Sequence, residues 1–263
     1  MNRPAAPSFD PWAASYDRYR PGYPDVLFTT IAERLSLPAH PRVADLGAGT
    51  GRASLAMAGH GWDVTAVEPG PGMLAVLRNS AAQAGLTLTA TQASAEATNL
   101  TDASFDVVTA AQAFHWFDKP AALREAARIL RPSGGVAVFW NTRDVDASVL
   151  LADFGALLER ATTGTGWWRD RDRQMKETRT ALESHPDFGA PELVELRHTE
   201  RMTPDAFVEM AFTVSQVQAL SHDAQERLRD ELQRLLARDG HDRQPTLSIP
   251  YRIDLWIARR SGE

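Results

Sequence analysis

Three glycines at alternating positions, Gly47, Gly49 and Gly51, follow the apolar run VADL and precede the helical stretch RASLAMA. A glycine turn between a strand and a helix lets the backbone approach a nucleotide-like ligand closely. The dinucleotide fingerprint G-x-G-x-x-G needs a glycine at position 52, which is Arg52 here, so the spacing disfavours NAD without excluding it. Asp45 stands just before the turn, where a carboxylate would repel a pyrophosphate but could orient the amino group of a cationic ligand. The pattern therefore favours a sulfonium over a dinucleotide.

Glu68 ends the second apolar run, DVTAVE. A carboxylate at the end of this strand can accept hydrogen bonds from both hydroxyls of a ribose. The alternative is that the glycines only make a tight turn and that Glu68 is a solvated strand end, which would require two coincidences. We interpret the turn and Glu68 as parts of one nucleoside site.

The run AQAFHWFD follows the fourth apolar run and contains His115 and Trp116. A histidine, with an unperturbed pKa of about 6.5, is the best candidate for a general base at the carboxyl end of a strand, where such sheets bind ligands. We expect His115 to face the substrate and Trp116 to shape its pocket; the alternative is that HWF only packs against the strand end. Trp140 and Asn141 end the fifth apolar run and could also line this pocket, although Asn141 could equally cap the strand.

The elements that position these residues are an alternation of short β-rich runs with helical stretches, which predicts an α/β fold with a parallel sheet. The expected strands are residues 43–46, 63–68, 86–91, 105–112 and 135–140. The expected helices between them are residues 52–59, 72–84 and 118–130.

The second half of the chain departs from this alternation. We expect a helix over residues 147–162, a strand over 193–201, a helix with Thr203 as its N-cap and Pro204 in first position, and a helix over 221–238. A final strand over 250–259 suggests an antiparallel edge on the parallel sheet. Residues 1–143 are then a cofactor-binding core with an N-terminal lid, and residues 144–263 a helical cap with strands that complete the same sheet.

The segment GTGWWRDRDRQ lies in the expected cap. Its arginines could hold an anionic substrate and Trp168 could cover it. The interspersed aspartates also fit a solvated face of alternating charge with the tryptophans packed inward.

Composition excludes several classes of site and partner. The 263 residues contain no cysteine, and the net charge of −6 opposes binding to nucleic acid. The six histidines other than His115, among them His198, show no metal-ligand spacing, and we interpret them as structural or solvent-facing; no metal is expected. No signal peptide or membrane-spanning run is visible, so we expect a cytoplasmic protein that does not bind membranes.

The runs VADLGAGTGR, AVEPGPGML and SFDVVTAAQAFHWFD resemble the class I S-adenosylmethionine-dependent methyltransferases, specifically methyltransferase type 11. The opening FDPWAASYDRYRPGYP and the final YRIDLWIARR are similar to the trans-aconitate-methyltransferase-like and cantharidin-resistance-like subgroup. The resemblance implies a Rossmann-like, doubly wound, seven-stranded sheet with an antiparallel last strand and a mostly helical cap. It also implies S-adenosylmethionine as cofactor, S-adenosylhomocysteine as product, and a small-molecule acceptor, by subgroup a carboxylic acid.

The same resemblance assigns the cofactor contacts. The methionine part of the cofactor is expected at Asp45, Gly47, Ala48, Gly49 and Gln112. Its ribose is expected at Glu68. Its adenine is expected at Pro69, Met73, Ser94, Ala95 and Glu96. Many relatives carry aspartate where this chain has Ser94, which leaves the adenine contact to serine, Glu96 or the backbone. Tyr16, Tyr19 and Arg20 would form a lid, with Arg20 paired to the cofactor carboxylate, or would pack on the sheet as a helix.

Two alternatives to a methyltransferase stay open at this point. A nicotinamide-dependent oxidoreductase would use the same glycine turn, and a non-catalytic S-adenosylmethionine-binding protein would use the same cofactor site. We expect a monomer or a homodimer.

Overall fold

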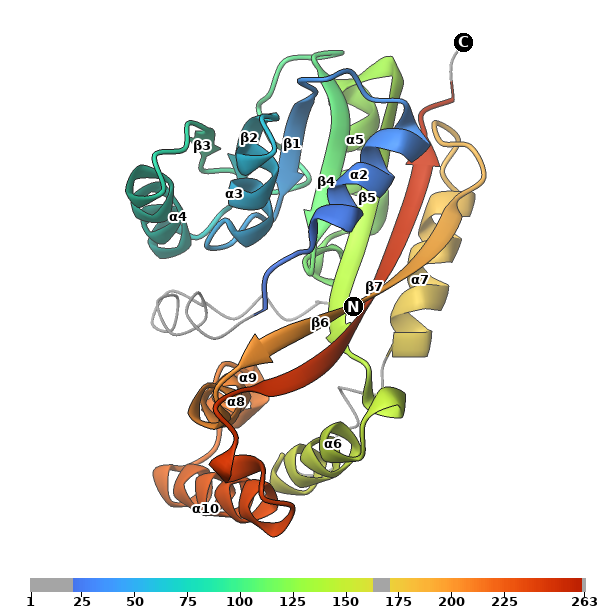
Figure 1. Cartoon of the computed structure of the whole chain (residues 1–263). Helices are drawn as coiled ribbons and strands as arrows, with labels where there is room; N and C mark the ends of the chain where they lie inside the picture. Colours follow the sequence, from blue (N-terminus) through green and yellow to red (C-terminus); the bar gives the residue numbers. More distant parts are fainter. Residues whose placement is uncertain (1–20, 163–170, 262–263) are drawn as a thin grey trace.

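The computed structural model describes residues 21–162 and 171–261, which contain a sheet of seven strands. The strands are β1 (Arg42–Leu46), β2 (Asp63–Val67), β3 (Thr89–Thr91), β4 (Phe105–Ala111), β5 (Leu130–Arg143), β6 (Glu192–Met202) and β7 (Leu247–Arg259). Their order is β3-β2-β1-β4-β5-β7-β6 (Figure 1). The first five pair in parallel, whereas β7 runs antiparallel to both β5 and β6. The predicted seven-stranded sheet with an antiparallel last strand is confirmed.

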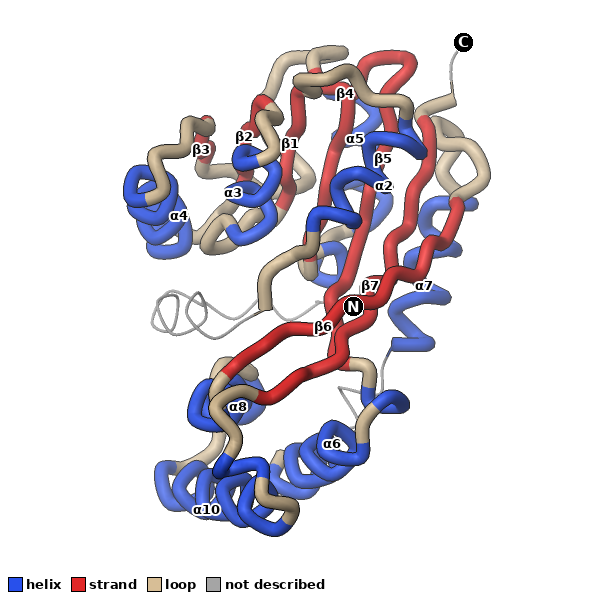
Figure 2. The backbone as a smooth tube through the Cα atoms, viewed as in Figure 1, coloured by secondary structure: helices blue, strands red, loops and turns tan. Residues whose placement is uncertain are grey.

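Helices cover both faces of this sheet, as a doubly wound fold requires (Figure 2). On one side, which we call the front face, α2 (Asp25–Leu35) and α3 (Arg52–Gly59) bury their apolar side chains. On the back face, α5 (Lys119–Ile129) and α7 (Arg171–Glu183) do the same. The remaining core helix, α4 (Pro71–Gln83), contacts β3.

The long strands β5, β6 and β7 extend beyond the parallel part of the sheet and carry a helical cap (Figure 1). The cap contains α6 (Val149–Ala161), α8 (Pro204–Ala211), α9 (Ser215–Gln218) and α10 (His222–Arg238), and it has a hydrophobic core of its own. Single 3-10 turns occur at η2 (Phe114–Trp116), η3 (Val145–Ala147) and η5 (His241–Arg243).

The helix starts in the cap follow the expected capping chemistry. Thr203 accepts a hydrogen bond from the Ala206 N–H at 3.2 Å, with Pro204 in the first position of α8. Ser221 caps α10 in the same way, through the Ala224 N–H at 3.4 Å. Such caps satisfy backbone donors that have no partner within the helix, which confirms both predicted starts.

Two helices depart from the sequence-based expectation. No helix was predicted over the residues of α2, because several of them are β-branched and lower its helix propensity. Burial of Leu27, Phe28, Ile31 and Leu35 stabilises this helix instead. The charged run that begins at Arg171 is a helix with only a narrow buried stripe. The division at residue 143 stays a prediction. No helix within the described ranges is both long and apolar enough to cross a bilayer.

Candidate active site

In the glycine turn after β1, the backbone packs closely against neighbouring side chains. Gly47 and Gly51 adopt left-handed φ angles of 68° and 88°. A Cβ on Gly47 would lie 2.7 Å from the Cβ of Ala113, and one on Gly51 would lie 2.5 Å from Cγ of Leu77. A Cβ on Gly49, by contrast, would have no neighbour within 4 Å, so open space faces this residue. Two glycines thus allow close packing, and the third leaves its backbone accessible to a ligand.

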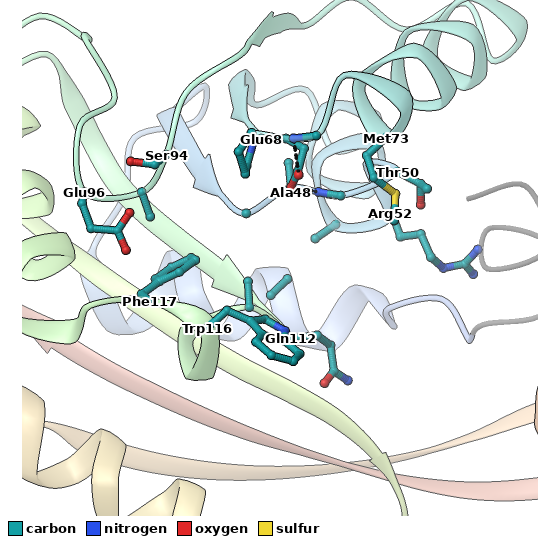
Figure 3. Close-up of a pocket in the computed structure, with 18 of the residues that line it drawn as sticks. Ala48, Thr50, Arg52, Glu68, Met73, Ser94, Glu96, Gln112, Trp116 and Phe117 are labelled. Atoms are coloured by element: carbon teal, nitrogen blue, oxygen red, sulfur yellow. Dashed lines mark hydrogen bonds between the residues drawn. The ribbon is translucent and has the colours of Figure 1, made fainter. Parts of the chain in front are cut away.

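Glu68 faces the same turn from the end of β2. Its Oε2 accepts a hydrogen bond from the Gly49 N–H at 3.0 Å, and its Oε1 accepts one from the Gly70 N–H at 2.8 Å (Figure 3). The half-buried carboxylate is therefore held in place by backbone donors on both sides. A carboxylate has further lone pairs, so it can still accept hydrogen bonds from vicinal hydroxyls.

These elements enclose a cavity of about 480 Å³, within the size range of small-molecule sites. Figure 3 shows the labelled side chains of the turn, of the β2 end and of the β4 end around it. The described residues that line it are Tyr23, Gly47, Ala48, Gly49, Thr50, Arg52, Ala53, Glu68, Pro69, Gly70, Pro71, Met73, Ser94, Ala95, Glu96, Ala111, Gln112, Ala113, Trp116 and Phe117. These described lining residues include two carboxylates and one guanidinium, so the walls suit a cationic ligand.

Most of the predicted cofactor residues lie together in this wall. Those placed there are Gly47, Ala48, Gly49, Glu68, Pro69, Met73, Ser94, Ala95, Glu96 and Gln112, and the predicted acceptor residue Trp116 joins them. Their individual contacts with a ligand stay predictions. Tyr16, Tyr19, Arg20 and Trp168 lie outside the described residues.

Asp45 does not face the cavity, which corrects the expectation that it contacts the cofactor. Its carboxylate is fully buried and accepts hydrogen bonds from the hydroxyls of Ser54 at 2.5 Å and Thr109 at 2.8 Å. Burial raises the pKa of Asp45 to about 6; the two hydroxyls oppose this shift and the charge of Glu68 adds to it. Asp45 therefore joins the start of α3 to β4 beside the glycine turn.

His115 and Trp140 are also absent from the described cavity lining. Trp140 is buried, and its indole N–H donates to Nδ1 of His115 at 3.3 Å. The imidazole is half-buried and its ring lies 4.8 Å from the ring of Trp116. Trp140 thus supports His115 from the interior, and its role toward an acceptor stays a prediction.

Asn141 is likewise engaged by the protein instead of lining the described cavity. Its Nδ2 donates to the carbonyl oxygen of Gly22 at 2.8 Å, and its Oδ1 lies 3.0 Å from Nε2 of His198. Its backbone carbonyl accepts a hydrogen bond from the side chain of Gln112 at 2.6 Å. Its side chain joins β5 to β6 and to the segment before α2, and its role toward an acceptor stays a prediction.

Several lining residues were missed by the sequence interpretation. Tyr23 packs edge-on against Phe139, with ring centroids 5.2 Å apart, and reaches the cavity from the segment before α2. Ala113 and Phe117 pack against Gly47. The glycine at position 47 was the one sign in the sequence that other side chains approach the turn closely. Arg52 stands at the position that rules out the dinucleotide fingerprint, and it donates to the Pro21 carbonyl at 3.1 Å.

Comparison with known proteins agrees with this geometry. A family model described as "Methyltransferase domain" matches residues 44–138. An uncharacterized methyltransferase of Mycobacterium tuberculosis is 34% identical over 234 residues, which cover 88% of this chain and 86% of that protein. The chain belongs to the methyltransferase family. This membership favours a methyltransferase over the oxidoreductase and non-catalytic alternatives.

Solved structures resemble the methyltransferase over nearly its whole length. A putative type II methyltransferase from Anaeromyxobacter dehalogenans is 28% identical, covers 93% of this chain and 100% of its own, and has a TM-score of 0.69. A phosphoethanolamine N-methyltransferase from Haemonchus contortus, solved with S-adenosylmethionine, shares the fold at 17% identity and a TM-score of 0.54 over 95% of this chain and 57% of its own. The methyltransferase is an enzyme that uses S-adenosylmethionine.

The cavity fits that cofactor. Open space at Gly49, a carboxylate at Glu68 and a net negative wall suit a nucleoside that carries a positive sulfonium. When bound, S-adenosylmethionine supplies an activated methyl carbon for in-line displacement. The residues of the methyltransferase bind and orient the two reactants and exclude water, which is the main contribution a protein makes to such a transfer.

Proposed function

We propose that the methyltransferase acts on a small carboxylic acid and converts its carboxylate into a methyl ester. The observation that carries this proposal is the hydrogen bond at His115. An indole N–H only donates, so Nδ1 of His115 accepts from Trp140, and the neutral ring carries its proton on Nε2. The second ring nitrogen is then a donor, which suits an anionic oxygen and does not suit a general base.

A carboxylate acceptor also needs no general base, because it is already ionised at neutral pH, whereas a hydroxyl must be deprotonated. Methyl transfer to a carboxylate moves the methyl group from sulfur to oxygen and releases no proton. Trp116 is 42% exposed beside the cavity and offers apolar surface for the rest of the acceptor.

The remaining features of the proposal concern partners. The net charge of −6 disfavours nucleic acid as the acceptor. We propose that the enzyme acts in the cytoplasm, as a monomer or homodimer, on a free metabolite.

The test is incubation of the methyltransferase with S-adenosylmethionine and matched panels of carboxylic acids, phenols and amines, followed by mass spectrometry. We expect a product from the acid panel that is heavier by one methyl group and is cleaved by mild base, as an ester is. Substitution His115→Phe should weaken acceptor binding and leave affinity for S-adenosylhomocysteine unchanged. Methylation confined to phenols or amines would contradict the proposal.

A further inference from the structure

Asn141 is a buried polar residue on an otherwise apolar part of the sheet. It lies on the front face of β5, 6% exposed, in register with Ile253 of β7 and Leu196 of β6. A buried amide is costly unless its donors and acceptors are paired. Here each side-chain atom has a partner: Nδ2 donates to the Gly22 carbonyl and Oδ1 faces His198.

The direction of these hydrogen bonds follows from chemistry. The Gly22 carbonyl can only accept, so the NH₂ group of Asn141 must point to it and Oδ1 must point to His198. His198 therefore donates from Nε2. Its Nδ1 lies 3.7 Å from Oε1 of Glu200, two residues further along β6. Burial lowers the pKa of His198, while the charge of Glu200 opposes that shift.

The main-chain carbonyl and the side-chain amide of Asn141 each contact a segment that lines the cofactor cavity. Gln112, which donates to the Asn141 carbonyl, lines the cavity and has a left-handed φ of 57°, a strained conformation for a residue with a side chain. Gly22 precedes Tyr23, which also lines the cavity. Asn141 thus contacts two separate parts of the cavity wall: Gln112 through its main-chain carbonyl, and the segment of Tyr23 through its side-chain amide.

His198 connects the same amide to the cap. Its ring stacks on Tyr251, with centroids 5.4 Å apart and an interplanar angle of 27°. The hydroxyl of Tyr251 in turn contacts Sδ of Met210 in α8, at 3.1 Å. A continuous set of contacts therefore runs from the cap core through β7 and β6 to the cavity wall.

We infer that Asn141 and His198 are positioning residues of this methyltransferase: the side-chain amide of Asn141 holds the segment that carries Tyr23 at the cofactor cavity, and His198 sets the orientation of that amide. Neither residue needs to touch the cofactor. This arrangement makes cofactor affinity depend on a hydrogen bond donated from β6, an edge strand that continues into the cap. The inference goes beyond the choice of acceptor and holds whichever acceptor is used.

The test measures the affinity for S-adenosylhomocysteine by calorimetry in variants of His198. His198→Phe keeps the ring volume and the stacking on Tyr251 but removes the donor, and we expect it to weaken binding by about tenfold, the equilibrium effect of one buried hydrogen bond. His198→Gln restores an N–H donor and should bring affinity back to within about twofold of the wild type. Asn141→Asp, which cannot donate to the Gly22 carbonyl, should lose affinity as His198→Phe does.

A matched control lies next to His198 on the other face of β6. Arg197 is exposed and pairs with Asp144 at 3.1 Å, so Arg197→Ala should leave affinity unchanged. Melting temperatures of all variants separate binding from stability. Equal affinities for His198→Phe and wild type would overturn the inference, and so would a His198→Gln variant that binds as weakly as His198→Phe. Absence of methylation of carboxylic acids would contradict only the proposed acceptor, because this test uses no acceptor.

Discussion

The substitution Asp45→Asn should stabilise the methyltransferase at neutral pH. Asp45 is fully buried and its pKa is raised to about 6, chiefly by desolvation. Its two partners are hydroxyls, from Ser54 and Thr109, which can either donate or accept. An asparagine has nearly the same shape and can accept from one hydroxyl and donate to the other, so it should keep both hydrogen bonds without the cost of a buried charge.

The magnitude follows from the shift in pKa. The ordinary value is 3.8 and the folded value is about 6, a difference of about two units. Each unit corresponds to about 1.4 kcal/mol, so ionised Asp45 lowers the free energy of unfolding by about 3 kcal/mol. Between about pH 4 and pH 6 the folded chain retains a proton that the unfolded chain has released. Stability from this group is therefore full below pH 4, falls as the pH rises through 6, and stays low above it.

The assay is urea unfolding, followed by tryptophan fluorescence, of wild type and Asp45→Asn from pH 4 to pH 8. The difference in free energy of unfolding between the two proteins should be small at pH 4 and should grow to about 3 kcal/mol in favour of the variant near pH 7. Taking the difference removes the contribution of all other titrating groups that the two proteins share. A Ser54→Ala variant provides the check on assignment: it removes a hydroxyl that lowers the pKa of Asp45, so its loss of stability should extend to higher pH.

The reasoning would be refuted by a difference that stays flat between pH 4 and pH 7. It would also be refuted if Asp45→Asn were less stable than the wild type at pH 7. Either result would mean that the buried carboxylate is fully compensated by its hydroxyl partners.

Three further outcomes are expected. Gly51→Ala combines a left-handed φ of 88° with a side-chain clash, so it should lower the free energy of unfolding by about 2–4 kcal/mol, measured by urea unfolding; a loss below about 1 kcal/mol would contradict the packing described. Glu68→Gln should weaken S-adenosylhomocysteine binding by about tenfold in calorimetry, and unchanged affinity would remove Glu68 from the cofactor site. Arg171→Ala leaves the fully buried Asp254 without its bidentate partner and should cost about 3–5 kcal/mol in urea unfolding, whereas a near-neutral effect would show that Asp254 finds another partner.

The parallel half of the fold was predictable because local signals there agree with one another. The helix at residues 52–59 was placed at its observed bounds, since a glycine turn precedes it and a new strand follows soon after. In the cap, Thr203 and Ser221 predicted the starts of helices, because their hydroxyls accept hydrogen bonds from backbone N–H groups only a few residues away. The strand β3 was expected over six residues but pairs only over Thr89–Thr91, because pairing at an edge depends on the neighbour and not on propensity.

The sequence did not predict those features of the site that depend on which way a side chain points. The alternation of side chains along a strand is visible in the sequence, but which face meets the cavity is not. Asp45 lies near the carboxyl end of β1, and Trp140 and Asn141 lie near that of β5, yet all three side chains are buried. His198 was interpreted as structural or solvent-facing because it lacks metal-ligand spacing; its contact with Asn141, 57 residues away, has no local pattern in the sequence.

Asp45 and Asn141 share a physical property that explains why they are polar. Asp45 and Asn141 lie behind the cavity wall, and each ties together elements that do not adjoin in the sequence: Asp45 joins α3 to β4, and Asn141 joins the strand ends to the segment before α2. Apolar residues at these positions would bury area without fixing direction, because hydrophobic contact is not directional. Hydrogen bonds fix direction, and they do so at the turn and at Gln112, where the backbone is left-handed. The two hydrogen bonds of Asp45 hold the start of α3 beside β4, and Asp45→Asn would measure the cost of the buried charge apart from those hydrogen bonds.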